Sequence, residues 1–166
     1  SWAGTLLGLS ARPVLIVDSP EQLAEARMRL ARVGIEDARG YLQGGIDGWK
    51  KAGLPTAEIP QITVEILNDR LQAGETSVLD VRREPEWQAG HVEGATWWPL
   101  DHFKVSPPEI DRTATIAVHC KSGYRSMIAC SLLQRAGFQN VTNVIGGFDA
   151  WLQAKLPVEV GSAVGV

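Results

Sequence analysis

The 166-residue sequence contains no apolar run of the roughly 20 residues that a membrane-spanning helix needs. It also lacks a basic excess, because a net charge of −3 provides no positive surface that would neutralise nucleic-acid phosphates or anionic lipids. Only two cysteines are present, too few for a disulfide framework. These absences predict a cytoplasmic protein that binds neither nucleic acid nor a membrane.

Histidine is scarce as well, with three in the chain and no His-x-His spacing, so we expect no metal site and no cofactor. The first residues lack the basic stretch of a secretory signal. The composition that remains, 45% hydrophobic and 21% charged residues, is typical of a globular protein with one ordinary core or two small ones.

An internal repeat is the most informative feature of the sequence. The segment Gly44–Pro55 (GGIDGWKKAGLP) recurs as Gly146–Pro157 (GGFDAWLQAKLP), 102 residues later by 146 minus 44. Each copy follows an apolar strand, a helix ending near Gly34 or Gly137, and a second short strand. Because solenoid repeats are roughly 20 to 50 residues long, this period predicts a domain duplication.

The second copy has a front half that the first copy lacks, from about residue 62 to residue 100. Its pattern predicts a helix over 64–72, a strand over 77–81, a helix over 84–89 and a strand around 95–99. Strands that alternate with helices indicate a parallel sheet, because parallel strands need crossover connections. We therefore predict an α/β fold, a parallel sheet flanked by helices.

The predicted organisation has one complete domain and one partial copy. Residues 1–56 form a partial, catalytically inactive unit, and 57–61 form a Pro-containing linker. Residues 62–160 form the active domain, and 161–166 form a tail.

Cys120 ends a predicted strand, 116–120, and precedes a short loop and a helix over 126–135. Ligands of parallel sheets bind at the carboxyl ends of strands, and the loop amides and helix N-terminus favour an anion there. Together with Lys121 and Arg125, they predict a lowered pKa and a nucleophilic thiolate. The alternative is a buried, inert cysteine, which is our interpretation of Cys130 within the helix.

Three separated motifs resemble those of rhodanese domains. The loop Cys120–Ser126 (CKSGYRS) resembles their active-site loop. The run from Trp87 through His91-Val-Glu-Gly-Ala95 resembles their earlier aromatic, three-residue, His-aliphatic-Pro-Gly-Ala motif, and Gly146–Trp151 closes the match. The resemblance covers 62–158, and the departures are Trp87 for Phe or Tyr and Glu93 for Pro. Neither departure affects the sulfur chemistry.

The resemblance implies a sulfurtransferase of the thiosulfate sulfurtransferase type. Cys120 would take sulfane sulfur from thiosulfate or a glutathione persulfide-type donor as a persulfide and pass it to a thiol acceptor. The loop is Cys-x4-Arg, whereas tyrosine phosphatases and their rhodanese-like relatives carry Cys-x5-Arg, so a phosphatase is disfavoured. A noncatalytic docking or regulatory module remains the alternative.

The predicted catalytic residue is Cys120, and loop amides would hold the persulfide and the departing oxyanion. The predicted substrate-binding residues are Lys121, Ser122, Gly123, Tyr124, Arg125, Ser126 and Arg82. For Arg125 and Arg82 a structural ion pair is the alternative to anion binding. Asp80 and His91 are expected to support the loop, and His119 should face the opposite side of the sheet from Cys120. Trp49 and Trp151 are expected in the core, and Trp97 or Trp98 at a pocket wall.

At an offset of 102, Cys120 falls opposite Asp18, in a loop with the acidic Glu21, and no cysteine precedes residue 120. The first copy is therefore expected to be inactive. An inactive copy followed by an active one resembles the end of fusion proteins that begin with a metallo-β-lactamase-like persulfide dioxygenase. That domain is an expected neighbour in the native chain.

Overall fold

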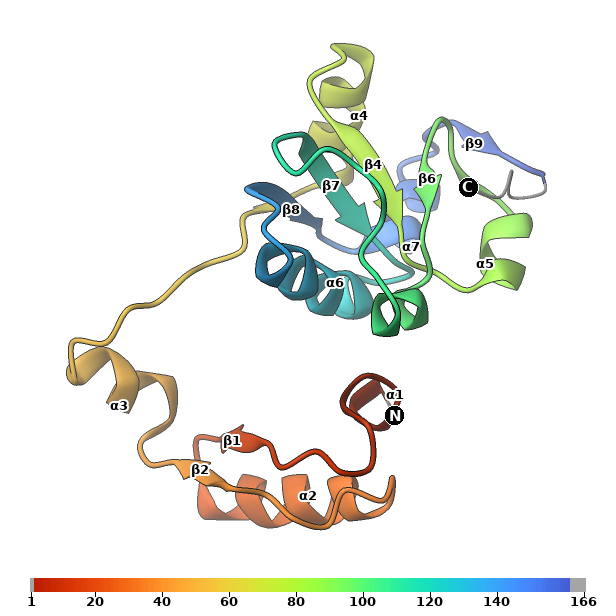
Figure 1. Cartoon of the computed structure of the whole chain (residues 1–166). Helices are drawn as coiled ribbons and strands as arrows, with labels where there is room; N and C mark the ends of the chain where they lie inside the picture. Colours follow the sequence, from red (N-terminus) through yellow and green to blue (C-terminus); the bar gives the residue numbers. More distant parts are fainter. Residues whose placement is uncertain (1, 162–166) are drawn as a thin grey trace. The chain divides into compact units, whose positions relative to one another are not determined.

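The computed structural model describes residues 2–161 and divides into two compact units whose boundary lies between Glu58 and Ile59 (Figure 1). This boundary falls inside the segment 57–61 that was predicted as a linker. Of the predicted tail, residues 162–166 lie outside the described residues. No helix in the described range is long and apolar enough to cross a membrane.

The second unit is built on a five-stranded sheet in the order β3-β8-β7-β4-β6, and all of its strand pairs are parallel. A separate antiparallel pair joins β5 and β9. The elements are β3 (Gln61–Ile62), α4 (Val64–Gln72), β4 (Ser77–Asp80), α5 (Glu84–Gln88), β5 (His91–Val92), β6 (Thr96–Trp97), the 3-10 helix η1 (Leu100–Lys104), β7 (Thr115–His119), α6 (Tyr124–Arg135), β8 (Asn140–Val144), α7 (Gly147–Gln153) and β9 (Val158–Glu159). The predicted α/β fold with a helix-flanked parallel sheet is confirmed.

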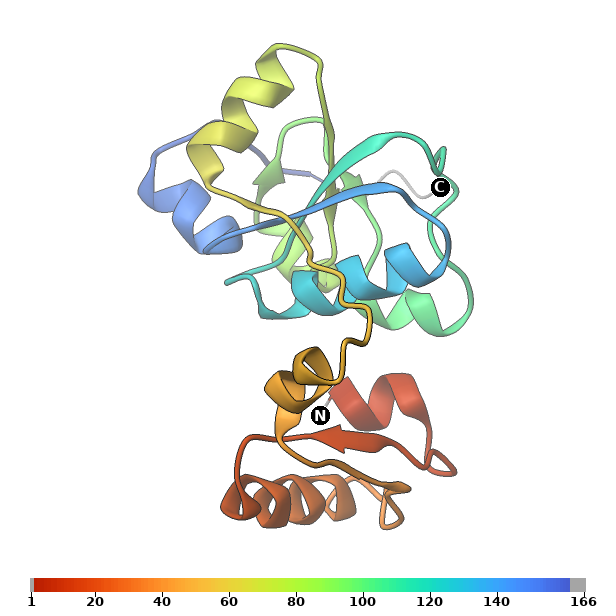
Figure 2. The ribbon, with the colours of Figure 1, turned by 90° about the vertical axis from the view of Figure 1, so that its left-hand side faces the viewer.

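In strands β7 and β8 every residue after the first is buried, and burial on both faces explains the apolar run 116–118 of β7. Helix α6 packs on one face of the sheet, and α4 and α7 pack on the other (Figure 2). On the α4 and α7 face, a cluster joins residues of both halves of the unit: Ile62, Val64, Leu67, Val78, Val92, Ala117, Val144, Phe148 and Trp151. This cluster anchors the strand ends that carry the site.

The first unit is much smaller in structure and contains one two-stranded parallel sheet, β1 with β2. Its elements are α1 (Trp2–Leu7), β1 (Val14–Ile16), α2 (Pro20–Ala31), β2 (Gly40–Leu42) and α3 (Gly45–Lys51). Among its described residues only Ile35 and Gly45 are buried. The unit therefore has little core of its own.

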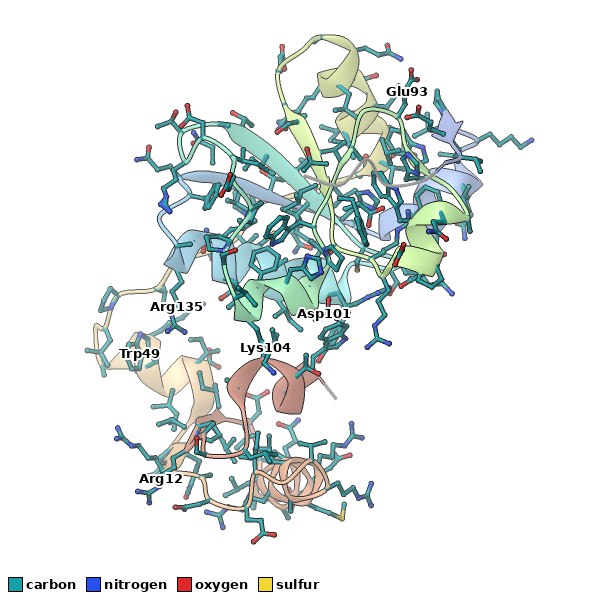
Figure 3. All side chains as sticks on the ribbon, turned by 45° about the vertical axis from the view of Figure 1, so that its right-hand side comes forward. Arg12, Trp49, Glu93, Asp101, Lys104 and Arg135 are labelled. Atoms are coloured by element: carbon teal, nitrogen blue, oxygen red, sulfur yellow. The ribbon has the colours of Figure 1, made fainter. Side chains whose placement is uncertain are left out.

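The repeated tryptophans make the same contact in both units. The indole N–H of Trp49, which lies on α3 (Figure 3), donates to the Pro55 carbonyl at 2.8 Å, and that of Trp151 donates to the Pro157 carbonyl at 2.8 Å. Trp151 is buried, as predicted, whereas Trp49 is only half-buried. The repeat is thus a repeat of local geometry as well as of sequence.

Candidate functional site

Cys120 lies directly after β7, between the strand end at His119 and the start of α6 at Tyr124. The predicted strand, 116–120, has the length of β7 but is shifted one residue towards the C-terminus, and the predicted helix begins two residues too late. The first turn of α7 fixes the loop, because the Phe148 N–H donates to the Cys120 carbonyl at 2.8 Å. A side chain at Gly147 would collide with that same carbonyl oxygen.

The Cys120 sulfur receives hydrogen bonds from the loop that follows it. The Gly123 N–H donates to Sγ at 3.2 Å and the Ser126 hydroxyl donates at 3.5 Å, while the residue is only 1% exposed. Burial raises the pKa of the thiol. Hydrogen bonds from the Ser126 hydroxyl and from the amides of Ser126, Ser122 and Gly123 outweigh burial, so the pKa of Cys120 is lowered. The arrangement favours a thiolate.

Gly123 makes this loop possible because it adopts a φ of 100°, in the left-handed region that glycine tolerates. In that conformation its amide reaches the sulfur, and its carbonyl oxygen lies 3.0 Å from the Ser126 hydroxyl, as an alternative acceptor for the single hydroxyl proton. The tight turn and the start of α6 therefore both converge on one sulfur atom.

Cys130 has the opposite environment. It is fully buried within α6, and burial raises the pKa of its thiol to about 12. The prediction that Cys130 belongs to the core is confirmed, and it stays a neutral thiol at physiological pH.

Arg125 does not present its guanidinium to a substrate. Nη1 and Nη2 each bind a carboxylate oxygen of Glu86 at 2.7 Å, in a bidentate pair whose arginine side chain is 15% exposed. The predicted anion-binding role of the Arg125 side chain is corrected here, because Glu86 already neutralises it. Arg125 instead forms the structural ion pair that was the predicted alternative. This pair joins α5 to α6, the helix that follows the loop.

Glu86 is a site residue that sequence reasoning missed. Its carboxylate also accepts the Arg83 N–H at 3.2 Å, and the hydrogen bonds from Arg125 lower the pKa of Glu86 although burial raises it. Glu86 and Arg125 are 39 positions apart, and no periodicity relates them. The only sequence signal was the position of Glu86 beside Trp87 in the earlier motif.

Arg82 is likewise corrected from a substrate-binding to a structural residue. It is 3% exposed, and its guanidinium binds the Asp80 carboxylate at 2.6 Å and the Gly90 carbonyl at 2.7 Å. It also lies 3.9 Å from the centre of the Phe148 ring. A buried guanidinium with these contacts is out of reach of a substrate in solution.

The predicted supporting residues, Asp80 and His91, are both buried, and so is His119. His119 is 1% exposed, with Nε2 at 3.6 Å from Asp80 Oδ2, and burial lowers its pKa. Its buried position agrees with the prediction that it does not act as a general base for Cys120. His91 stacks on Trp87 with ring centres 3.6 Å apart.

Lys121, Ser122 and Tyr124 have exposed side chains at the mouth of the loop. Tyr124 is 70% exposed. Lys121 is the loop cation that remains available to an anion in solution once Arg125 is paired with Glu86. Its substrate-binding role stays a prediction.

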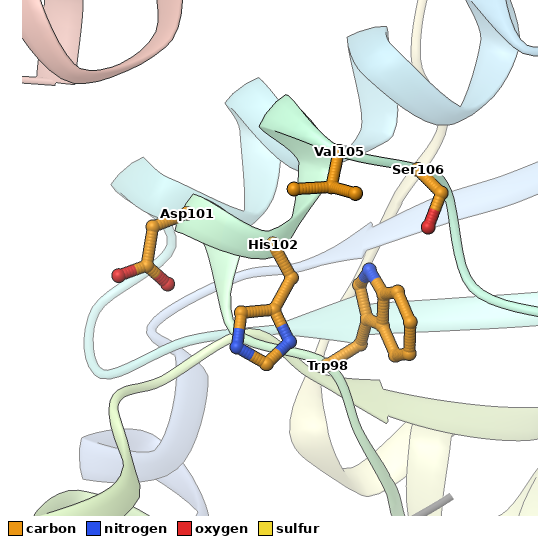
Figure 4. Close-up of a pocket in the computed structure, with 5 residues that line it drawn as sticks. All are labelled: Trp98, Asp101, His102, Val105 and Ser106. Carbon is orange, nitrogen blue, oxygen red and sulfur yellow. The ribbon is translucent and has the colours of Figure 1, made fainter.

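A separate cavity of about 420 Å³ lies beside η1 (Figure 4). Its lining comprises Trp98, Asp101, His102, Val105 and Ser106, with the rings of Trp98 and His102 meeting edge to face at 5.4 Å. The neighbouring Trp97 instead donates its indole N–H to the Arg82 carbonyl at 2.9 Å. Trp98 is therefore the member of the pair that walls a cavity, although no residue of the Cys120 loop lines this one.

Helices α2 and α6 end with the same contacts, at an offset of 103. The Gly34 N–H donates to the Ala31 carbonyl, and the Gly137 N–H to the Gln134 carbonyl, both at 3.0 Å. The following residues, Ile35 and Phe138, are both buried. The helix ends are therefore 103 residues apart, whereas the Gly-Gly segments are 102 residues apart.

The strand pairing shows which residue of the first unit takes the place of Cys120. Val14 pairs with Gly40 as Ala117 pairs with Thr142. Gly40 precedes Thr142 by 102 positions, so Val14 matches Ala117 at an offset of 103. Val17 then occupies the position of Cys120, and the predicted match with Asp18 is wrong by one residue. The cause is an extra residue between the helix and the Gly-Gly turn of the first unit, which the motif spacing alone does not reveal.

Comparisons with known proteins agree with this geometry. The family model described as rhodanese-like domain matches residues 63–154. A sulfurtransferase from Allochromatium vinosum is 32% identical over 101 residues, which cover 60% of this chain and 94% of that protein. A putative sulfur carrier protein, YrkF from Bacillus subtilis, is 30% identical over 96 residues, which cover 57% of this chain. The matched region spans about half of that relative, 52% of its length.

Solved structures give the same result for the fold. A rhodanese-related protein from Thermoplasma volcanium has a TM-score of 0.57 at 26% identity, over 61% of this chain and 99% of that one. A rhodanese-like domain protein from Staphylococcus aureus has a TM-score of 0.57 at 25% identity, over 63% and 100%.

Proposed function

Because the chain belongs to the rhodanese-like domain family, we propose that it is a sulfurtransferase in which Cys120 carries a sulfane sulfur as a persulfide. The observation that carries the proposal is the pair of donors on one sulfur, the Gly123 amide and the Ser126 hydroxyl. A thiolate stabilised in this way is the nucleophile that sulfur transfer requires.

In the first step, the Cys120 thiolate attacks the outer sulfur of a donor such as thiosulfate. A new S–S bond forms to Cys120 as the S–S bond of thiosulfate breaks, and the electron pair of the broken bond leaves with sulfite. The amides that face Sγ are placed to stabilise negative charge on the persulfide.

In the second step, an acceptor thiolate attacks the outer sulfur of the persulfide. The bond to Cys120 breaks, its electron pair returns to Cys120 as thiolate, and the acceptor leaves as a persulfide. No metal or redox cofactor takes part in either step, since each is a displacement at sulfur.

We propose thiosulfate or a glutathione persulfide as donor, with Lys121 as the residue that attracts the anion. Its exposed side chain beside the loop supports this role. The Cys-x4-Arg length of the loop supports sulfur over a phosphate ester, because the turn closes tightly around Sγ through the Gly123 amide. The cytoplasmic location and the neighbouring persulfide dioxygenase domain stay predictions.

We also propose that residues 1–56 are the back half of a second, inactive rhodanese-like unit. The shared Trp-to-Pro contact, the similar hydrogen bonds at the two helix ends and the nearly equal φ angles of Gly45 and Gly147, 57° and 56°, support it. Val17 in place of the cysteine accounts for its inactivity.

Sulfite release from thiosulfate, with glutathione or cyanide as acceptor, tests the activity. We expect turnover by the wild type and by Cys130→Ser, and none by Cys120→Ser. A folded wild type that neither turns over nor takes up sulfur from several donors would instead favour a docking or regulatory module.

A further inference from the structure

The charge of the Arg125 guanidinium is neutralised within the protein before any donor binds. Its Nη1 and Nη2 atoms each bind a Glu86 carboxylate oxygen at 2.7 Å, and the arginine and glutamate side chains are 15% and 31% exposed. Charge-assisted, bidentate hydrogen bonds of this kind are among the strongest in proteins. A donor in solution therefore meets Arg125 as one half of an ion pair and not as a free cation.

Glu86 is also held by its own helix. It lies in the first turn of α5, and its carboxylate accepts the Arg83 N–H at 3.2 Å. The hydrogen bonds from Arg125 are the main cause of the lowered pKa of Glu86, so the carboxylate is ionised near neutral pH. The negative charge of Glu86 is therefore a fixed part of the site.

The Glu86–Arg125 pair lies within electrostatic range of the reacting sulfur. Hydrogen bonding to Glu86 is the largest cause that raises the pKa of Arg125, and the negative charge of Cys120 raises it further. The loop over 120–126 contains one more cation, the exposed Lys121. The two loop cations are thus matched by two anions, the Cys120 thiolate and Glu86, and these four charges sum to zero.

This charge balance affects donors of different charge unequally. Thiosulfate brings two negative charges to the four groups that already cancel, whereas an organic persulfide or a thiosulfonate brings one at its reacting group. Because Arg125 and Glu86 are partly buried, their charges are screened less than those of an open surface. Neutralising Arg125 therefore costs a dianionic donor more attraction than it costs a singly charged one.

On the basis of the proposed sulfur transfer, we propose that the site is selective for sulfane-sulfur donors with one negative charge at the reacting group, such as organic persulfides and thiosulfonates. Glu86 sets this selectivity, because it cancels the cation that a dianion would otherwise use. With a thiosulfonate, Cys120 attacks the outer sulfur and a new S–S bond forms. The S–S bond of the donor breaks, and its electron pair leaves with a sulfinate.

The experiment compares kcat/KM for thiosulfate with kcat/KM for methanethiosulfonate, in which a methyl group replaces one oxygen and a single negative charge remains. Dividing the donor ratio of a variant by that of the wild type removes the different intrinsic reactivity of the two donors. Glu86→Gln keeps an oxygen for Arg125 but loses the charge, so it should raise the ratio in favour of thiosulfate by about fivefold. Arg125→Gln leaves the charge of Glu86 uncompensated and should lower the ratio by about the same factor. Both shifts should shrink as salt is added.

Two controls separate selectivity from a general disturbance of the loop. Glu84→Gln makes the same charge change on the same helix, at an exposed residue whose side chain binds Gln88, and should keep the donor ratio within about twofold of the wild type. The double variant with Glu86→Gln and Arg125→Gln removes both charges and should restore the wild-type ratio. Damage to the loop would not be reversed in this way.

The outcomes distinguish the selectivity from the sulfur transfer itself. A donor ratio that Glu86→Gln leaves unchanged, or a loss of kcat/KM by the same factor for both donors, would overturn the selectivity alone. A wild type that takes sulfur from neither donor would overturn the proposed function and the selectivity together.

Discussion

The two strand-to-helix loops of the molecule occupy similar places in their units but have opposite chemistry, and their backbones differ where Gly123 has a φ of 100° and the matching residue is Pro20. Each follows the end of a parallel strand, leads into a 12-residue helix and lies against a Gly-Gly turn. Position by position, the active loop Cys-Lys-Ser-Gly-Tyr-Arg-Ser (120–126) is matched by Val-Asp-Ser-Pro-Glu-Gln-Leu (17–23).

The differences remove the sulfur and two of the groups that donate to it. Val17 has no thiol, Pro20 has no N–H where Gly123 donates to Sγ, and Leu23 has no hydroxyl where Ser126 donates. The fold therefore provides a position for a nucleophile at the strand end. The side chain at that position and the hydrogen-bond donors around it decide whether it is reactive.

Replacing Cys120 by the valine found at the matching position of the first unit should have the largest effect on sulfur transfer. Cys120→Val gives the second unit the residue of the first, and we expect sulfur transfer to fall by about a thousandfold or more, to the background rate. The fold should persist, because valine is apolar and similar in size. Sulfite release and thermal unfolding measure the two properties, and residual turnover above background would contradict the role of Cys120.

Gly147→Ala tests the support of the loop. A side chain at this φ of 56° would be strained and would collide with the Cys120 carbonyl, so we expect a loss of about 2–4 kcal/mol in the free energy of unfolding. Gly45→Ala in the first unit is the matched change: its Cβ would approach the Val17 carbonyl only to 3.2 Å, and the nearer atom, Asp18 Oδ1 at 2.8 Å, is the end of a side chain that can move. Urea unfolding should show the larger loss for Gly147→Ala, and equal losses would contradict this account.

Ser126→Ala removes the hydroxyl donor that the matching Leu23 of the first unit also lacks. Removing a hydrogen bond that favours the thiolate should raise the pKa of Cys120, so its reactivity should appear at higher pH than in the wild type. A hydrogen bond to a charged group contributes about 1.5 kcal/mol or more, so alkylation by iodoacetamide near neutral pH should slow by about tenfold.

The control for this change is Ser122→Ala, which keeps the backbone amide that contributes to the low pKa of Cys120. Its pH profile of alkylation should match that of the wild type. Identical profiles for Ser126→Ala and the wild type would show that the hydroxyl does not stabilise the thiolate.

Lys121→Asp gives the loop the charge of the first unit and should have the smallest effect. Attraction of an exposed cation for an anionic donor is screened by water and salt, so we expect kcat/KM for thiosulfate to fall by about three- to tenfold. The difference from wild type should shrink as salt is added, and Lys121→Arg should retain most of the activity. A salt-independent loss would point to a change of loop structure.

Sequence reasoning predicted the parallel sheet and the position of Cys120 because both depend on local patterns. The apolar run within β7, and the glycine that allows a φ of 100° at position 123, are visible in the chain itself. Val64–Gln72 was predicted to the residue, since Thr63 caps α4 by accepting the Ile66 N–H at 3.4 Å.

The misassigned residues depend on distant partners. Arg125 was assigned to an anionic donor because its charge is visible in sequence, but its partner Glu86 lies on another helix. The charge of Arg82 fits either a substrate-binding or a structural role, and its burial beside Asp80 decides for the structural one. The match of Cys120 with Asp18 failed because an inserted residue changes the offset inside the repeat.

Intact-mass spectrometry of the full chain after incubation with thiosulfate, without an acceptor, tests the central claim most directly. We predict a mass increase of one sulfur atom, reversed by glutathione, present in Cys130→Ser and absent in Cys120→Ser. A folded wild type that gains no sulfur from thiosulfate or from a glutathione persulfide, or a gain that persists in Cys120→Ser, would contradict it.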